Sequence, residues 1–208
     1  MHVVSIDKPT VNQMPLVTFP GQIHVIDAVS RVKSAVNALR TSPIVGFDTE
    51  TRPCFRRGDR HNVALLQLST ETDAFLFRVN KTGIPTSLKE FLEDQDCIKI
   101  GLSTTDDFHQ LTRICDIQPA GFIELQQLVK QYDIVDMGLQ KIYAILFQKK
   151  ISKGQQLTNW EAVQLTEAQQ RYAAIDAWAC LRIYNYLQTG AFIPEESPYW
   201  HELVEEEK

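Results

Sequence analysis

The 208-residue sequence lacks several features that mark special classes of protein. It has no apolar run near the roughly 20 residues that cross a bilayer, which argues against a membrane-spanning helix. Its N-terminus has neither a basic leader nor a hydrophobic stretch, so we expect no secretory signal and a cytoplasmic location. It has no internal repeat and no low-complexity tract, which argues against fibrous and disordered proteins.

Patterned cysteines and an excess of positive charge are also missing. The four cysteines, Cys54, Cys97, Cys115 and Cys180, form no C-x-x-C pair, which argues against a zinc knuckle or a disulfide framework. The 21 basic residues are outnumbered by 26 acidic ones, which gives a net charge of −5. Without a basic coat, any nucleic-acid partner must be bound locally or through a cation.

Short strands and helices alternate along the chain. Apolar runs predict strands at residues 23–26, 44–48, 63–68, 74–77, 97–101 and 122–125. Helical spacing predicts helices over residues 27–39, 87–93, 106–115, 125–132, 138–147 and 166–187. Three strands with short connections, followed by alternating strands and helices, indicate an α/β fold with a central mixed sheet flanked by helices.

The length and the turn residues predict one domain with short extensions. Residues 1–22 contain three prolines and no sustained period, so we expect an extended N-terminal arm. Residues 23–190 are predicted to form the domain. Residues 191–208 are rich in glutamate and are predicted to be an acidic C-terminal tail.

The first candidate functional residues are Asp48 and Glu50, at the end of the strand predicted at residues 44–48. The strand period of two places both side chains on one face. Two neighbouring carboxylates repel each other and lose hydration there, and a divalent cation such as Mg²⁺ or Mn²⁺ is the usual remedy. The alternative is a solvated acidic turn.

Tyr172 and Asp176 form a second pair, on the helix predicted at residues 166–187. Their i, i+4 spacing stacks them on one helical face, among alanines that let a helix approach a sheet closely. An aspartate in that setting should not face the core unless it is paired or metal-bound. The alternative orientation puts the aspartate in solvent and the tyrosine in the core.

Asp106 and Asp107 open a third element, the helix predicted at residues 106–115. One of the two aspartates is expected to be the helix N-cap. The other is then free to point into a cleft. The residues by themselves leave the choice between them open.

The order of these acidic motifs resembles that of the DEDD superfamily of 3′–5′ exonucleases. The motifs are D-x-E on a strand, an aspartate at the start of a middle helix and Y-x-x-x-D on a late helix. The resemblance covers residues 25–190 and extends to the stretches 62–68, 159–160 and 165–169. It is closest to the branch that contains the Werner syndrome exonuclease domain, with ribonuclease D more distant. It implies a DnaQ-like, ribonuclease H-like fold and two divalent cations, Mg²⁺ or Mn²⁺.

Position by position, the resemblance implies a catalytic set of Asp48, Glu50, Asp107, Tyr172 and Asp176. Counting back from Asp116 favours Asp107 over Asp106 as the third acid. The sister branch has a histidine five residues before the last aspartate, where this chain has Arg171. The tyrosine subtype, DEDDy, is therefore the better fit.

The resemblance also implies how this set divides its work. In such a mechanism two metal ions roughly 3.5–4 Å apart clamp the scissile phosphate. Asp48 is expected to bridge both ions. Glu50 and Asp176 are expected to complete one site, and Asp107 to hold the other ion partly through water. Tyr172 is expected to orient the attacking water, because a pKa near 10 makes it a poor base at neutral pH.

Two basic runs and two apolar residues are candidate contacts for nucleic acid. The basic runs are Arg52, Arg56, Arg57 and Arg60, and Lys149, Lys150 and Lys153. Phe55 and Leu102 are candidate wedges against terminal bases. For each basic run the alternative is an ordinary solvated face. Trp160 is predicted to pack beneath the last helices, and His109 to lie at the surface.

The complete acid set, the tyrosine and the resemblance together imply a metal-dependent exonuclease that degrades DNA from a free 3′ end and releases nucleoside 5′-monophosphates. The alternatives are a ribonuclease D-like RNA trimmer, a catalytically inactive nucleic-acid-binding module and an endonuclease. A separate helicase is a candidate partner, and no membrane partner is expected. The tail at residues 191–208, with six glutamates and one lysine, carries the whole net charge, so the remaining residues are balanced.

Overall fold

The computed structural model describes residues 1–54 and 61–203, and its centre is a six-stranded mixed sheet. Across the sheet the strand order is β2-β5-β4-β3-β6-β7. The strands are β2 (Gln22–Ile26), β3 (Ile44–Thr51), β4 (Val63–Ser69), β5 (Asp73–Phe77), β6 (Ile98–Gly101) and β7 (Phe122–Glu124). β4 is antiparallel to both neighbours, and the other pairs are parallel. The predicted α/β fold with a mixed sheet is confirmed.

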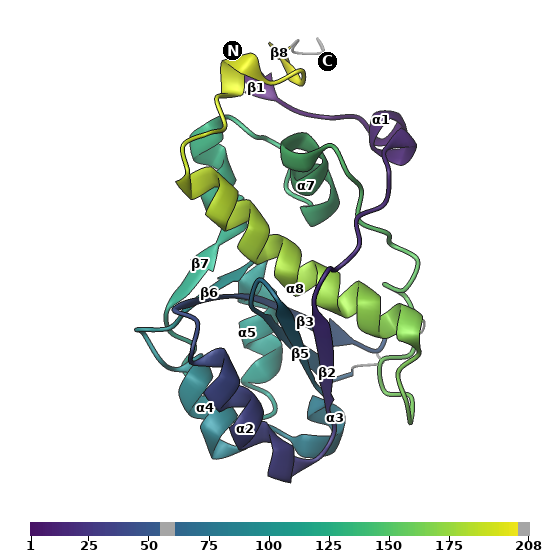
Figure 1. Cartoon of the computed structure of the whole chain (residues 1–208), viewed down its shortest axis with the longest axis vertical. Helices are drawn as coiled ribbons and strands as arrows, with labels where there is room; N and C mark the ends of the chain where they lie inside the picture. The colour runs from purple at the N-terminus through teal and green to yellow at the C-terminus, as the bar shows by residue number, and fades with distance from the viewer. Residues whose placement is uncertain (55–60, 204–208) are drawn as a thin grey trace.

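Helices cover both faces of the sheet (Figure 1). One face carries α2 (Val29–Leu39), α3 (Val79–Thr82), α4 (Thr86–Leu92) and α5 (Thr104–Leu111). The other carries α8 (Glu167–Gln188), with α7 (Leu139–Phe147) packed on its outer side. Short helical turns are α6 (Leu125–Leu128), Val129–Tyr132 and Pro194–Glu196. Within the described part of the chain, no helix has both the length and the apolar character needed to cross a membrane.

Helix α8 begins at a capping box and lies very close to β3. Thr166 Oγ1 accepts a hydrogen bond from the Gln169 amide at 3.2 Å, and Gln169 Oε1 accepts one from the Thr166 amide at 3.0 Å. A Cβ atom on Gly46 of β3 would lie 1.8 Å from the carbonyl oxygen of Ala177. Glycine is therefore required at position 46 for α8 to pack against β3, and this packing brings the acids of both elements side by side.

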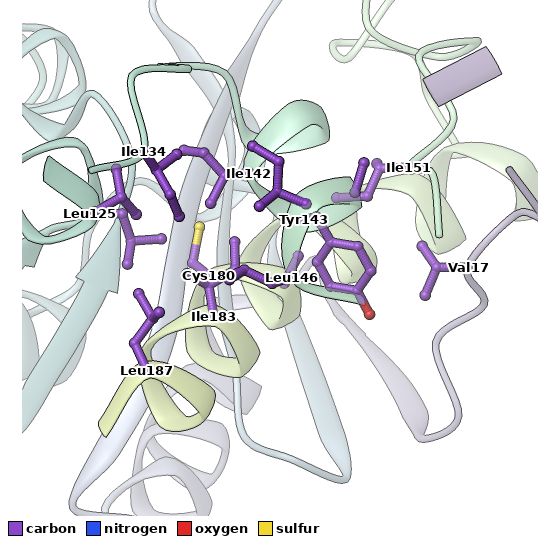
Figure 2. Close-up of a cluster of buried hydrophobic side chains, with 14 of the residues drawn as sticks. Val17, Leu125, Ile134, Ile142, Tyr143, Leu146, Ile151, Cys180, Ile183 and Leu187 are labelled. Atoms are coloured by element: carbon purple, nitrogen blue, oxygen red, sulfur yellow. The ribbon is translucent and has the colours of Figure 1, made fainter. Parts of the chain in front are cut away.

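Hydrophobic clusters on both sides of the sheet hold this arrangement. Between the sheet and helices α2 and α4, Phe47 and Phe91 are fully buried. On the outer side of α8, the α7 side chains Ile142 and Leu146 lie beside Cys180 of α8 in one buried cluster (Figure 2). Each large apolar side chain buried in this way contributes roughly 1.5–3 kcal/mol to stability. Helix α8, which carries Tyr172 and Asp176, is thus packed on both of its sides.

The two ends of the chain differ from the predicted extended arm and tail. Residues Lys8–Gln13 form α1, whose N-cap Asp7 accepts a hydrogen bond from the Thr10 amide at 2.6 Å. Strand β1 (His2–Val4) pairs antiparallel with β8 (Trp200–Glu202), so the first and last described segments lie together (Figure 1). Local periodicity carries no information about pairing between residues so far apart in sequence.

Candidate active site

Three carboxylates meet at the end of β3 on the side that faces α8. One oxygen from each of Asp48, Glu50 and Asp176 lies within 4.8 Å of the other two. The strand period explains why Asp48 and Glu50 share a face, and α8 supplies Asp176, which is only 6% exposed. The structure thus brings together three of the four acids expected from the sequence.

The fourth acid, Asp107, reaches the same strand from α5. Its Oδ1 accepts a hydrogen bond from Thr49 Oγ1, and Thr49 stands between the two acids of β3. The strand period turns the Thr49 side chain away from those acids and toward the α5 side of the sheet. The neighbouring Asp106 is exposed. The geometry therefore favours Asp107 over Asp106.

Neither aspartate is the N-cap of α5, so the expectation that one of them would cap this helix is wrong. The helix begins at Thr104, and the N-cap residue is Ser103 with φ 61°. The free amide groups at this end donate instead to Glu124, at the end of β7. A cap supplied by a distant strand leaves no local signal in the sequence.

The electrostatics of the four acids indicate a site built for positive charge. Burial raises the pKa of Asp48 well above its usual range, and the charges of Asp176 and Glu50 raise it further. Burial raises the pKa of Glu50 to about 9. Burial also raises the pKa of Asp107 to about 7, although the hydrogen bond from Thr49 opposes this. Without a cation the four groups resist ionising together.

Asp176 differs from the other acids because two neighbours partly favour its ionised form. Burial raises its pKa to about 7, while the Tyr172 hydroxyl and the charge of Lys153 act in the opposite direction. Oxygen ligands of this kind suit Mg²⁺ and Mn²⁺. The cluster of buried carboxylates therefore fits divalent cations by its donor chemistry and by its charge.

Tyr172 lies one turn before Asp176 on α8 and lines the same cleft. Burial and the nearby carboxylates raise the pKa of Tyr172 above its ordinary value, so the hydroxyl keeps its proton at neutral pH. It is therefore a hydrogen-bond donor in this site. Its ring packs beside Trp160, with the centroids 5.9 Å apart, and Trp160 is fully buried, as the sequence predicts.

Asp48, Glu50 and Asp176 form one wall of a cleft of about 320 Å³, and sequence reasoning largely missed its other wall. That wall comes from the N-terminal end of α7 and from the segment that follows α7, and it contains Gly138, Leu139, Gln140, Ile151, Ser152, Lys153 and Gln156. Leu102 and Cys180 also line the cleft. Of these residues only Leu102 and Lys153 were candidates from the sequence. Local periodicity does not tell which residues will face a cleft that forms between segments far apart in sequence.

Only one of the four arginines predicted to contact nucleic acid lies within the described residues. Phe55, Arg56, Arg57 and Arg60 lie outside the described residues. Arg52 is described, and its Nη1 lies 3.4 Å from Glu161 Oε2 in an ion pair. His61 Nδ1 lies 3.6 Å from the other oxygen of Glu161. Arg52 is therefore engaged by a protein carboxylate in this structure.

The lysine run is divided between different surroundings. The Lys150 ammonium donates to the Asn12 carbonyl and so fastens the N-terminal segment. Lys149 is exposed, and Lys153 lines the cleft. His109 is exposed, as predicted. Only Lys153 of this run is placed beside the acids.

Comparisons with known proteins agree with this geometry. A family model described as 3′–5′ exonuclease matches residues 23–190. The mouse protein named bifunctional 3′–5′ exonuclease/ATP-dependent helicase WRN is 30% identical over 186 residues, which cover 85% of this chain and 13% of that protein. The chain thus spans a small part of this relative's length.

Two solved structures share the fold. The Aedes aegypti Nibbler EXO domain has a TM-score of 0.75 at 22% identity, covering 86% of this chain and 96% of that one. Escherichia coli RNase D, described as an exoribonuclease involved in structured RNA processing, has a TM-score of 0.71 at 24% identity, covering 80% of this chain and 44% of that one. At these identities the likeness shows the ribonuclease H-like fold.

Proposed function

The chain belongs to the 3′–5′ exonuclease family, and on this premise we propose that it degrades DNA from a free 3′ end with the help of two divalent cations. The single observation that carries this proposal is the group of three carboxylates within 4.8 Å at the end of β3. The relative at 30% identity is named for its exonuclease and helicase activities, which supports an exonuclease, and we propose DNA because the acid set and Tyr172 resemble the Werner syndrome branch. A helicase partner stays a prediction.

Each acid has a proposed role in holding the cations. The charges of Asp176, Glu50 and Asp107 all act on Asp48, so it is the residue suited to bind both cations. Glu50 and Asp176 complete one site, and Asp107 contributes to the other. When bound, Mg²⁺ or Mn²⁺ supplies positive charge to the phosphate and lowers the pKa of water.

The other side chains of the cleft orient the substrate. The Tyr172 hydroxyl keeps its proton beside Asp176, from where it would donate a hydrogen bond to the phosphate or to the attacking water. Lys153 supplies positive charge from the opposite wall. Leu102 offers an apolar surface to the terminal base. The nucleic-acid contacts predicted at Arg52 require its release from Glu161.

A ribonuclease D-like activity on RNA is the second candidate, favoured by the structural likeness to RNase D. The test is a side-by-side digestion of 5′-labelled DNA and RNA of matched sequence, with Mg²⁺, Mn²⁺ or EDTA. We expect a ladder that shortens from the 3′ end of DNA only when metal is present. Faster loss of RNA would assign the chain to RNA, and cleavage of closed circular DNA would contradict an exonuclease.

A further inference from the structure

Glu124, the last residue of β7, accepts four hydrogen bonds through one carboxylate. Its Oε1 accepts from the backbone amides of Ser103 and Gln126, each at 3.0 Å. Its Oε2 accepts from the Thr104 amide at 2.8 Å and from Thr104 Oγ1 at 3.0 Å. One side chain therefore joins the end of β7 to the first residues of both α5 and α6.

This carboxylate constrains a backbone conformation that a serine rarely adopts. Ser103 has φ 61° and ψ 34°, in the left-handed region. A residue with a Cβ atom stays in that region only when its surroundings determine it. The hydrogen bonds that Glu124 accepts from Ser103 and Thr104 supply such a constraint, so they fix how the chain enters α5.

The entry into α5 sets the position of Asp107. Thr104 is the first residue of α5, and Asp107 follows three residues later on the same side of the helix. Phe108 packs edge-on against Phe122 of β7, with the centroids 4.7 Å apart, so β7 holds α5 at a second point. The hydrogen bond from Thr49 then joins the correctly placed Asp107 to β3.

We propose that Glu124 is a positioning residue for the nuclease centre, because it sets the N-terminus of α5 so that Asp107 meets the acids of β3. Both of its oxygens are occupied by protein donors, so it acts through Asp107 and is not itself a cation ligand. This inference rests on the proposed function, which assigns Asp107 to cation binding.

The test is the binding of Mn²⁺ to the purified full chain, measured by calorimetry for the wild type, Glu124→Gln and Glu93→Gln. Glu93 is a matched control, because its Oε1 also accepts from a backbone amide, that of Gln118 at 2.9 Å, and it does not line the cleft. We expect Glu124→Gln to weaken Mn²⁺ binding on the order of 10-fold, as outer-shell partners of metal ligands do. Glu93→Gln should leave the isotherm unchanged.

A second comparison asks whether Glu124 acts through Asp107. In an Asp107→Asn background, Glu124→Gln should cause no further loss of Mn²⁺ affinity. Additive losses would overturn the proposal, as would an unchanged isotherm for Glu124→Gln in the wild-type background.

Thr104→Val is a milder variant that removes only the hydroxyl donor to Glu124. It should weaken Mn²⁺ binding about 2- to 3-fold, in line with the loss of one hydrogen bond. If Glu124→Gln does not fold, an unchanged isotherm for Thr104→Val overturns the proposal. A wild type that neither binds Mn²⁺ nor degrades nucleic acid would instead refute the proposed function.

Discussion

The two halves of β3 face the same helix but differ in what they contribute to the protein. In the first half, Gly46 lets α8 lie against the strand, and Val45 and Phe47 are fully buried. In the second half, Asp48 and Glu50 meet a third carboxylate from α8. Packing stabilises the first half, whereas crowded carboxylates destabilise the second until a cation binds. One strand thus separates residues that hold the fold from residues that carry the chemistry.

The largest expected effect comes from the second half of β3. Asp48→Asn should lower nuclease activity on the order of 10³-fold or more, because it removes the carboxylate on which the charges of the other three acids act. The protein should still fold, with an unchanged circular dichroism spectrum. Asp106→Asn, at an exposed position beside Asp107, is the matched control and should keep wild-type activity. Full activity in Asp48→Asn would show that the second half of β3 does not carry the chemistry.

A substitution in the first half of β3 should instead lower the stability of the fold. Gly46→Ala places a Cβ atom 1.8 Å from the Ala177 carbonyl oxygen, so we expect a loss of about 3 kcal/mol or more in unfolding free energy. Gly138→Ala is the control, since a Cβ atom there meets no described atom within 4 Å. Denaturant midpoints measure both variants. Equal midpoints would show that α8 does not pack against β3 as described.

Tyr172→Phe should have a smaller effect, and it should separate the contribution of α8 to activity from its contribution to stability. The loss of one hydrogen-bond donor should lower activity about 10- to 100-fold, because bonds to charged groups are worth about 1.5–3 kcal/mol. The ring remains packed beside Trp160, so stability should change little. Stabilisation by Mn²⁺ should be unaltered, and its loss would mean that the hydroxyl also supports the cation site.

The smallest expected effect is on metal-free stability as a function of pH. The pKa values of Asp107 and Asp176 are raised to about 7 and that of Glu50 to about 9, so the folded state holds their protons more tightly than the unfolded state. The stability that these three protonated carboxyl groups add to the folded state is fully present below about pH 4 and is lost as pH rises through 7 to 9. In EDTA, Tm should therefore fall by several degrees between pH 5 and pH 9. Saturating Mg²⁺ should reduce this decline.

The parts of the site that sequence predicted are those governed by local periodicity. The strand period placed Asp48 and Glu50 on one face, and the helical period placed Tyr172 one turn from Asp176. The mixed sheet followed from the order of short strands and helices. In each of these cases the neighbours in sequence determine the geometry.

The parts that sequence did not predict depend on contacts between distant residues. Glu124 caps α5 from another strand, which is why the expected aspartate cap was wrong. The ion pair of Arg52 with Glu161 joins positions 109 residues apart. The pairing of β1 with β8 joins the two ends of the described chain. None of these contacts leaves a pattern in the residues around either partner.

The most direct test of the account is the thermal stability of Asp176→Asn beside the wild type, with and without Mn²⁺, at neutral pH. Asp176 is 6% exposed, so removing its charge should raise metal-free Tm by a few degrees, corresponding to about 1 kcal/mol. Saturating Mn²⁺ should reverse the order, because only the wild type keeps the full set of ligands. Two results would contradict a carboxylate cluster that binds cations. One is a metal-free wild type that is more stable than metal-free Asp176→Asn. The other is a wild type whose Tm does not rise with Mn²⁺.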